Sequence, residues 1–364
     1  MRIFGAPRQY IQGPGAIAQA ARIAAMHHGT PLIIADALVW PGASAAMLEP
    51  FETAPPVLTF AGEITPEAIA ELEQKARGVI DHNASVLVFG VGGGKTLDAA
   101  KAVVLRIGGD FVSVPTAASN DSPTGRAIAI YDDHHKLAKI ENLPRNPEAV
   151  IADTALIAKA PARLLRSGIG DAIAKKFEAL RARDDGGLNY FGTRPLISAI
   201  AIAERCYDVL RAHGEAAMKV AGTGEVTDDL EAVVEASILM AGIAWESGGV
   251  SLSHALVRGI ARTPGAEQSL HGEHVAYGLL GQLAIEGRDD DFIIDLMRFY
   301  KAIGQPVTLR GLGAHDDGQT TLEQIAAWVL DGPQGGNLIV SATCDEMVAA
   351  LVRVERLARD GRIA

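Results

Sequence analysis

Three side chains in the second half of the chain have the chemistry of metal ligands. Asp171 follows Gly168-Ile169-Gly170 at the expected start of a helix. His254 lies in a segment with helical spacing, and His271 comes shortly before another such segment. One carboxylate and two imidazoles are a sufficient protein set for a catalytic zinc ion that keeps one coordination position open. Each residue also has an ordinary structural explanation: Asp171 as a helix cap, His254 as a partly buried histidine and His271 as a loop residue. Their spacing matches no local zinc motif, so spacing alone does not establish the site.

A glycine-rich segment at residues 90–101 is the second candidate site. The apolar run at residues 86–89 predicts a strand buried on both faces, and helical spacing after the glycines predicts a helix. Glycine lets a ligand approach the backbone, and free N–H groups at a helix start attract an anion such as a dinucleotide pyrophosphate. The segment matches neither the Gly-x-Gly-x-x-Gly fingerprint nor the phosphate loop, and such a turn is also a common way to end a strand.

Two further features of the first half are candidates for nucleotide binding. Asp36 ends the apolar strand predicted at residues 31–35, where an acidic residue commonly binds the adenosine ribose and repels a 2′-phosphate. Capping of the following helix is an equally good explanation of Asp36. The strand predicted at residues 111–114 runs into a hydroxyl-rich loop at residues 115–124. Open α/β sheets bind ligands at such carboxyl ends of parallel strands.

The elements that must position these residues change in type near Pro161. Before it, apolar runs alternate with helical patterns, which predicts a Rossmann-like α/β domain over residues 1–160, the part of the chain that contains the candidate nucleotide-binding residues. After it, nearly all patterns are helical, which predicts an all-helical domain over residues 161–364, the part that contains the candidate metal ligands, with the active site between the two. Strands are expected at residues 3–10, 31–35, 57–60, 86–89, 111–114, 127–131 and 150–153. Helices are expected at residues 16–26, 67–83, 171–183, 195–213, 230–244, 252–262, 274–283, 290–302, 322–330 and 345–359.

The composition argues against several classes of protein. The chain has 364 residues, 48% of them hydrophobic, and a net charge of −11. This is enough for a substantial core, and the acidity argues against a nucleic-acid partner. Cys206 and Cys344 are far apart in sequence, which argues against a disulfide framework or a thiolate metal site. No apolar stretch has the length of a membrane span and no signal-peptide pattern is present, so we expect a soluble cytoplasmic protein.

Five segments resemble, in this order, the metal-dependent polyol dehydrogenases. The closest subgroup is glycerol dehydrogenase, within the superfamily of iron-containing alcohol dehydrogenases and dehydroquinate synthase. The segments are residues 90–101, 115–124, 146–153, 160–171 and 270–278. The resemblance runs over nearly the whole chain. It implies a dehydroquinate synthase-like fold, NAD in the cleft, a divalent metal below the nicotinamide, a small-molecule substrate, and a homo-oligomer such as an octamer.

The resemblance also implies roles for individual residues. It places the metal on Asp171, His254 and His271, which makes them catalytic residues. It places Asp121 beside the substrate hydroxyls. For the cofactor it implies contacts of Gly92, Gly93, Gly94 and Lys95 with the pyrophosphate and Asp98 nearby, contacts of Thr116, Ser119 and Tyr131 on the nicotinamide side, and a contact of Asp36 with the adenosine ribose.

The expected reaction is the NAD-dependent oxidation of a secondary hydroxyl of glycerol or a related small polyol to the ketone. A metal bound to that oxygen lowers the pKa of the hydroxyl, which favours loss of its proton as hydride leaves carbon. Zinc is favoured because two imidazoles and one carboxylate suit it. The iron-using branch of the superfamily has an extra histidine where this chain has Lys175. Asp121 is a candidate to orient the second hydroxyl or to pass the proton toward solvent, with an Asx-turn as its alternative.

Several residues depart from the pattern of glycerol dehydrogenases. Lys175 lies on the same helical face as Asp171, so that its ammonium could reach the ligand carboxylate or the substrate. Arg258 stands where asparagine is typical, Arg126 where a small residue is usual, and Trp245 where phenylalanine is expected near the polyol. The three cations Lys175, Arg258 and Arg126 are most simply explained as solvated or ion-paired side chains. Two or three of them beside one pocket support the alternative of a substrate with a carboxylate or phosphate group.

Two further functions are weaker on sequence grounds. A lyase like dehydroquinate synthase uses the same scaffold, but its substrate pattern rich in lysine and arginine is not evident here. A catalytically silent NAD-binding assembly subunit would have no reason to keep Asp171, His254 and His271 together. The preference for NAD over NADP depends mainly on Asp36.

Overall fold

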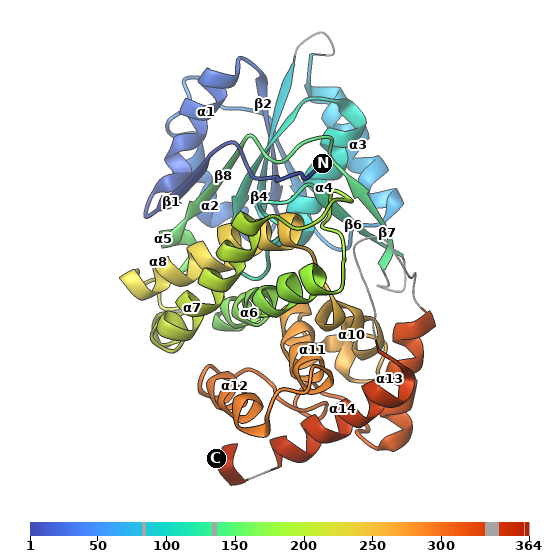
Figure 1. Cartoon of the computed structure of the whole chain (residues 1–364). Coiled ribbons are helices and arrows are strands. Elements are labelled where there is room, and N and C mark those ends of the chain that lie inside the picture. The colour runs from blue at the N-terminus through green and yellow to red at the C-terminus, as the bar shows by residue number, and fades with distance from the viewer. Residues whose placement is uncertain (82–84, 133–136, 332–341, 360, 364) are drawn as a thin grey trace. The chain divides into compact units, whose positions relative to one another are not determined.

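The computed structural model describes residues 1–81, 85–132, 137–331, 342–359 and 361–363 (Figure 1). The chain forms two compact units. The α/β unit contains Gly5–Pro161 and Val220–Gly242, and the helical unit contains Met1–Phe4, Ala162–Lys219 and Ile243–Ala364. A parallel α/β sheet followed by a largely helical region confirms the predicted fold class. The predicted domain ranges, 1–160 and 161–364, stay a prediction.

A six-stranded sheet forms the centre of the α/β unit. Its strand order is β1-β8-β5-β4-β2-β3, and all neighbouring strands are parallel. At the carboxyl edge Gly92 of β4 lies opposite Pro115 of β5, so the two predicted ligand loops start beside each other. The strands are β1 Tyr10–Gly13, β2 Thr30–Asp36, β3 Val57–Phe60, β4 Val86–Gly92, β5 Asp110–Pro115 and β8 Ala149–Asp153.

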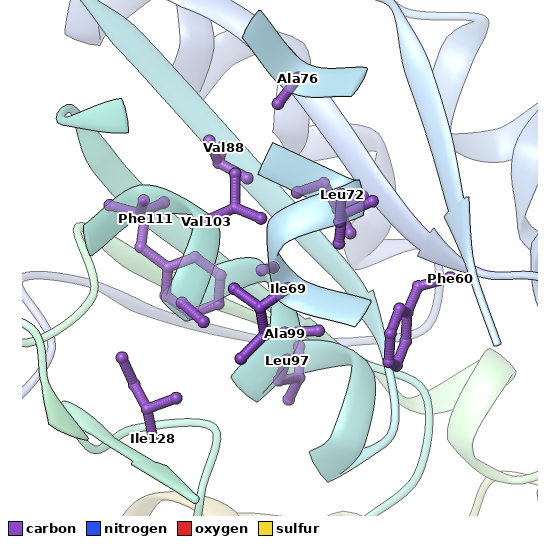
Figure 2. Close-up of a cluster of buried hydrophobic side chains, with 14 of the residues drawn as sticks. Phe60, Ile69, Leu72, Ala76, Val88, Leu97, Ala99, Val103, Phe111 and Ile128 are labelled. Atoms are coloured by element: carbon purple, nitrogen blue, oxygen red, sulfur yellow. The ribbon is translucent and has the colours of Figure 1, made fainter. Parts of the chain in front are cut away.

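Helices cover both faces of this sheet, which explains why its central strands are uninterrupted apolar runs. Alternate residues of β4 enter two different cores: Val88 packs with α3 and α4, whereas Phe89 packs with α1 and α2. Figure 2 shows the first of these cores, with Leu72 of α3 and Val103 of α4 among its residues. The helices and turns of this unit are a 3₁₀ turn Ala16–Gln19, α1 Ala20–His27, α2 Trp40–Leu48, α3 Pro66–Val79, α4 Gly94–Ile107, α5 Thr154–Ile157, α8 Asp228–Glu235 and a π-helical turn Ala236–Met240.

Some sequence predictions for this unit are wrong. Of the strand predicted at residues 3–10, only Tyr10 belongs to β1. The helix predicted at residues 67–83 ends at Val79, and its last two predicted residues lie outside the described residues. The helix expected after Asp36 is α2, whose bounds were not predicted. The sequence did not indicate β7 (Leu137–Asn142), which pairs antiparallel with β6 (Ala127–Tyr131). The side chains of β7 are almost all exposed, so no alternation of buried and exposed positions marks it as a strand.

The helical unit brings three helices, α6, α10 and α11, into contact. Glycine makes part of this packing possible, because a Cβ on Gly272 of α11 would collide with the carbonyl oxygen of Ser167 in α6. No helix among the described residues has both the length and the apolar character needed to cross a membrane. The remaining elements of the chain are α6 Ala162–Asp184, α7 Ile197–Val220, α9 Ala241–Ile243, a π-helical turn Ala244–Gly248, α10 Leu252–Ile260, a 3₁₀ turn Ala266–Gln268, α11 His271–Ile285, α12 Asp290–Ala302, α13 Gln319–Asp331, α14 Cys344–Ala358 and a 3₁₀ turn Gly361–Ile363.

Candidate functional site

The three predicted metal ligands lie together in the helical unit. Asp171, His254 and His271 each offer one ligand atom, and these atoms all lie within 4.8 Å of one another. The nearest oxygen of Asp171, Oδ1, is 3.5 Å from Nε2 of His254 and 3.9 Å from Nε2 of His271. The three residues come from α6, α10 and α11, so the contact among these helices assembles the group.

Two expectations about the local structure of this group are wrong. Asp171 does not begin a helix: it is the tenth residue of α6, which starts at Ala162. Gly168 and Gly170 are helical, and a Cβ on Gly170 would approach the carbonyl oxygen of Gly272 to 2.5 Å. Neither glycine forms a turn, and Gly170 permits the close packing of α6 against α11. His271 is not a loop residue either, because it is the first residue of α11.

Glu178 orients His254. Its Oε2 lies 2.8 Å from Nδ1 of the imidazole, and its Oε1 accepts hydrogen bonds from the backbone N–H groups of Ser251 and His254 at 2.9 and 3.1 Å. The carboxylate thus satisfies free donors at the start of α10 and directs the other ring nitrogen toward Asp171. Glu178 is buried, and the sequence predictions did not include it. Its spacing of seven residues from Asp171, which places both on one helical face, was the available signal.

Lys175 reaches the same group from one turn along α6. Its Nζ lies 2.7 Å from Oδ1 of Asp171 and 3.2 Å from Nε2 of His254, and its side chain is 0% exposed. This confirms the prediction that the ammonium could reach the ligand carboxylate. A fully buried lysine is rare unless it is paired.

The charges in this group set its protonation. Burial raises the pKa of Asp171, but the charge of Lys175 and the contacts of both histidines outweigh burial, so this pKa lies well below its ordinary range. Burial also raises the pKa of Glu178, but His254 and Lys175 bring it below its ordinary value. Burial lowers the pKa of His254, whereas Glu178 and Asp171 raise it, to about 9. Desolvation lowers the pKa of His271, the charge of Asp171 opposes this shift, and His254 and Lys175 add to it. Both carboxylates are therefore anions at neutral pH.

The donor chemistry of this group fits a divalent cation. One carboxylate and two imidazoles whose ligand atoms converge are the set that a catalytic zinc site uses. The carboxylate of Glu178 behind His254 is a further feature of such sites, because it fixes the tautomer and orientation of the ring. Lys175 is the unusual member, since its Nζ contacts two of the donor atoms.

The glycine turn lies at the carboxyl edge of the sheet in the α/β unit. Strand β4 ends at Gly92, Gly93 is the residue before α4, and Gly94 begins that helix. A Cβ would lie 2.6 Å from the Cβ of Thr96 if placed on Gly92, and 2.9 Å from Nδ2 of Asn120 if placed on Gly94. A side chain at Gly92 would therefore press on Thr96, and one at Gly94 would require Asn120 to move, whereas nothing lies within 4 Å of the Cβ position of Gly93. The space beside Gly93 leaves room for a ligand to approach the start of α4.

Two of the predicted cofactor residues carry charges near this turn. Asp36 accepts hydrogen bonds from the N–H groups of Leu38 and Val39 at 2.9 and 3.2 Å, as a turn-capping residue does. Its second oxygen lies 3.3 Å from Oγ1 of Thr96, in the first turn of α4, which brings the candidate ribose contact beside the glycine turn. The ammonium of Lys95 pairs with Glu63 at 2.7 Å.

The remaining predicted cofactor residues lie in the same unit. Asp98 is buried and binds Lys101 and the N–H of Ala129, at 3.2 and 3.0 Å, so it ties α4 to β6. Thr116 is buried and its N–H donates to the carbonyl oxygen of Gly92. Burial, followed by the charges of Asp98 and Glu63, raises the pKa of Tyr131 to about 12. Ser119 is half-buried.

The predicted substrate residues are divided between the two units. In the α/β unit, Asp121 is half-buried, its carbonyl oxygen accepts a hydrogen bond from Thr124, and Arg126 immediately precedes β6. In the helical unit, the ring of Trp245 lies 4.3 Å from that of Tyr190, measured between centroids. Arg258 lies one turn after His254 on α10, and burial followed by the charge of Arg262 lowers its pKa.

A parallel sheet with a glycine turn at its carboxyl edge, followed by helices that carry an Asp/His/His group, is typical of oxidoreductases that act on alcohol groups. Residues 7–154 match the family model described as iron-containing alcohol dehydrogenase. The chain belongs to this family, and within it is a glycerol dehydrogenase-like oxidoreductase.

Three relatives show the extent of the similarity. A glycerol dehydrogenase from Escherichia coli O6:H1 is 36% identical over 355 residues, which cover 96% of each chain. A glycolaldehyde reductase from Halobacterium salinarum is 35% identical over 332 residues, which cover 90% of each chain. The crystal structure of a probable glycerol dehydrogenase from Sinorhizobium meliloti 1021 has a TM-score of 0.88 and 31% identity, over 98% of this chain and 99% of that one.

Proposed function

We propose that the protein is an NAD-dependent dehydrogenase that oxidises a secondary hydroxyl of glycerol or a related small polyol to the ketone, with one zinc ion held by Asp171, His254 and His271. In the reaction the carbon gives a hydride to the nicotinamide and the hydroxyl gives a proton to solvent. The convergence of one carboxylate and two imidazoles within 4.8 Å is the observation that carries the proposal. The names of the glycerol dehydrogenase and glycolaldehyde reductase relatives support a small substrate with neighbouring oxygen atoms.

The proposed metal has a defined chemical purpose. A divalent cation at this group supplies positive charge beside the substrate oxygen and thereby lowers the pKa of the hydroxyl. The protein side chains prepare the site: Asp171 contributes an anion, and Glu178 keeps the Nε2 atom of His254 directed toward it. Asp121 is the proposed residue for orienting the second hydroxyl or passing the proton toward solvent.

The proposed cofactor contacts are those of the α/β unit. The start of α4, after Gly92 and Gly93, offers backbone N–H groups to the pyrophosphate. The carboxylate of Asp36 beside Thr96 supports NAD over NADP, because an anion there repels a 2′-phosphate. We also propose a homo-oligomer and a cytoplasmic location; the two free cysteines, Cys206 and Cys344, are consistent with a reducing compartment.

A second candidate function is oxidation of an anionic hydroxy substrate, such as a hydroxycarboxylate or a polyol phosphate. The observation that favours it is the positive charge near the metal group: Lys175 within it, and Arg258 one helical turn after His254. An arginine in such a position suits a carboxylate or phosphate. Arg126 is the third proposed contact.

A substrate panel tests both candidates. We expect NAD-linked oxidation of glycerol and other small polyols, with NADP at least about tenfold poorer in kcat/KM. Under the first candidate, Arg258→Ala leaves kcat/KM for glycerol within about twofold of wild type. Under the second, an anionic substrate is preferred and Arg258→Ala raises its KM about tenfold or more, as expected for loss of a charged hydrogen bond. Absence of nicotinamide-linked turnover with every alcohol, polyol and hydroxy acid would contradict the proposed function.

A further inference from the structure

The ammonium of Lys175 touches the atoms that the proposed metal would need. We propose that Lys175 is a tethered cation that occupies the Asp171–His254 pair, so that a divalent metal binds this chain only by displacing it. The site then holds zinc weakly and exchanges it readily. This inference rests on the metal site of the proposed function, and it concerns the affinity of that site and not the reaction.

The distances show that the ammonium and a metal would use the same donor atoms. Nζ of Lys175 lies 2.7 Å from Oδ1 of Asp171, and this oxygen is also the one nearest to both histidines. A metal binds only the neutral form of the His254 ring. In that form the proton on Nδ1 faces Glu178, so the single lone pair of the ring is on Nε2. This atom faces Nζ at 3.2 Å. One lone pair cannot accept a hydrogen bond from an ammonium and bind a metal at the same time.

Burial makes the competition strong. The side chain of Lys175 is 0% exposed and that of Asp171 is 1% exposed, so little water screens their attraction. The same lack of screening makes a divalent cation beside this ammonium unfavourable, because like charges repel strongly where solvent is excluded. Both costs fall on metal binding: the ion must replace a buried ion pair, and the ammonium must move away.

The covalent tether keeps the competitor close. Lys175 lies four residues after Asp171 on α6, so both remain on one face of a helix whose neighbouring residues are buried. A displaced ammonium therefore stays near the group and competes at a high effective concentration. Free lysine in solution would compete far less.

The next residue offers a matched control. Lys176 carries the same charge on the same helix, but its Nζ lies over the ring of Tyr207, 4.3 Å from the ring centroid. A substitution there removes one positive charge from α6 without removing the contact with Asp171 and His254. Any general effect of charge on zinc affinity appears in this control.

Zinc titration of the metal-stripped full-length protein tests the inference, with neither nicotinamide nor substrate present. The zinc Kd is measured by competition with a chromogenic chelator for wild type, Lys175→Leu, Lys175→Gln and Lys176→Leu. We expect Lys175→Leu and Lys175→Gln to bind zinc about tenfold to hundredfold more tightly than wild type, the range over which neighbouring groups tune metal affinity. Lys176→Leu is expected to match wild type. The glutamine side chain is one atom shorter and uncharged but stays polar, so the comparison holds even if leucine disturbs folding.

Equal Kd values for wild type and the Lys175 variants would overturn the inference, as would an equal gain in affinity for Lys176→Leu. Failure of all variants to bind zinc would overturn it as well. These outcomes are distinct from failure of the proposed function. Equal Kd values together with chelator-sensitive polyol oxidation would remove the inference alone. Tighter binding by the Lys175 variants without any nicotinamide-linked activity would support it and remove the proposed function.

Discussion

At the scale of single residues, the site depends on side chains that hold others in place. Glu178 accepts three hydrogen bonds, two from the start of α10 and one from the ring of His254. Lys175 pairs with Asp171 from the same helix. The two residues act on metal affinity in opposite directions, because one orients a ligand and the other competes for it.

Replacement of Glu178 tests the orienting role. A glutamine removes the negative charge and one acceptor, so the ring of His254 is held less firmly. We expect Glu178→Gln to raise the zinc Kd about tenfold to hundredfold, a shift opposite to that of Lys175→Leu. The measurement is the same competition titration. Glu286→Gln, at the end of α11, is the control and is expected to leave the Kd unchanged. A Kd for Glu178→Gln equal to that of wild type would show that the carboxylate does not prepare His254.

The metal-ligand group was the part of the site that the types of its residues made it possible to predict. A carboxylate and two histidines suggested a metal, but their ordinary structural roles could be set aside only through the resemblance to polyol dehydrogenases. The spacing of Glu178 from Asp171 placed it on the same helical face but did not single it out, because a glutamate on a helix is most often solvated. Only the packing of α10 on α6 reveals that it is buried. The partner of Lys175 was predictable from its spacing of four residues, since positions i and i+4 of a helix are neighbours.

At the scale of elements, the start of α11 fixes His271. Glu273, two residues later, accepts hydrogen bonds from the N–H of Leu270 and from Arg163 and Arg166 of α6, at 2.8, 2.7 and 2.6 Å. It therefore caps α11 and ties it to the helix that carries Asp171. These contacts lower the pKa of Glu273 to about 2, against the opposing effect of burial.

The lowered pKa of Glu273 predicts how stability depends on pH. Because the folded-state pKa is below the unfolded value, the carboxylate stabilises the fold above its unfolded pKa of 4.5 and loses this effect as the pH falls toward about 2. We expect Glu273→Gln to lower the free energy of unfolding by about 2 kcal/mol at neutral pH, the scale of a charged hydrogen bond, and by less near pH 3. Urea denaturation of both proteins across this range provides the measurement. A difference that stays constant with pH would contradict the assignment.

Helices and strands could be predicted where their buried positions follow a regular pattern along the sequence. The runs in β4 and β5 are apolar because helices cover both faces of the sheet, and α12 has the predicted bounds of residues 290–302. The start of α6 was missed because Gly168 and Gly170 resemble a turn, whereas both lie within the helix and Gly170 permits close packing against α11. Segments with exposed side chains, such as β7, carry too little pattern to be predicted.

At the scale of the whole molecule, the two units divide the chemistry. The α/β unit carries the glycine turn and Asp36, which are the proposed cofactor contacts, and the helical unit carries the Asp/His/His group. Membership of the iron-containing alcohol dehydrogenase family accounts for this combination. The departures at Lys175 and Arg258 are where this chain is expected to differ in metal affinity and substrate from glycerol dehydrogenases.

Metal dependence of turnover tests the central claim most directly. The protein is stripped with a chelator, dialysed, and assayed for NAD-linked oxidation of the best substrate of the panel before and after addition of zinc. If Asp171, His254 and His271 hold a catalytic cation, chelation abolishes activity, zinc restores it in wild type, and zinc fails to restore it in His271→Ala. Full activity of the stripped protein, or restoration by zinc in His271→Ala equal to that in wild type, would contradict the account.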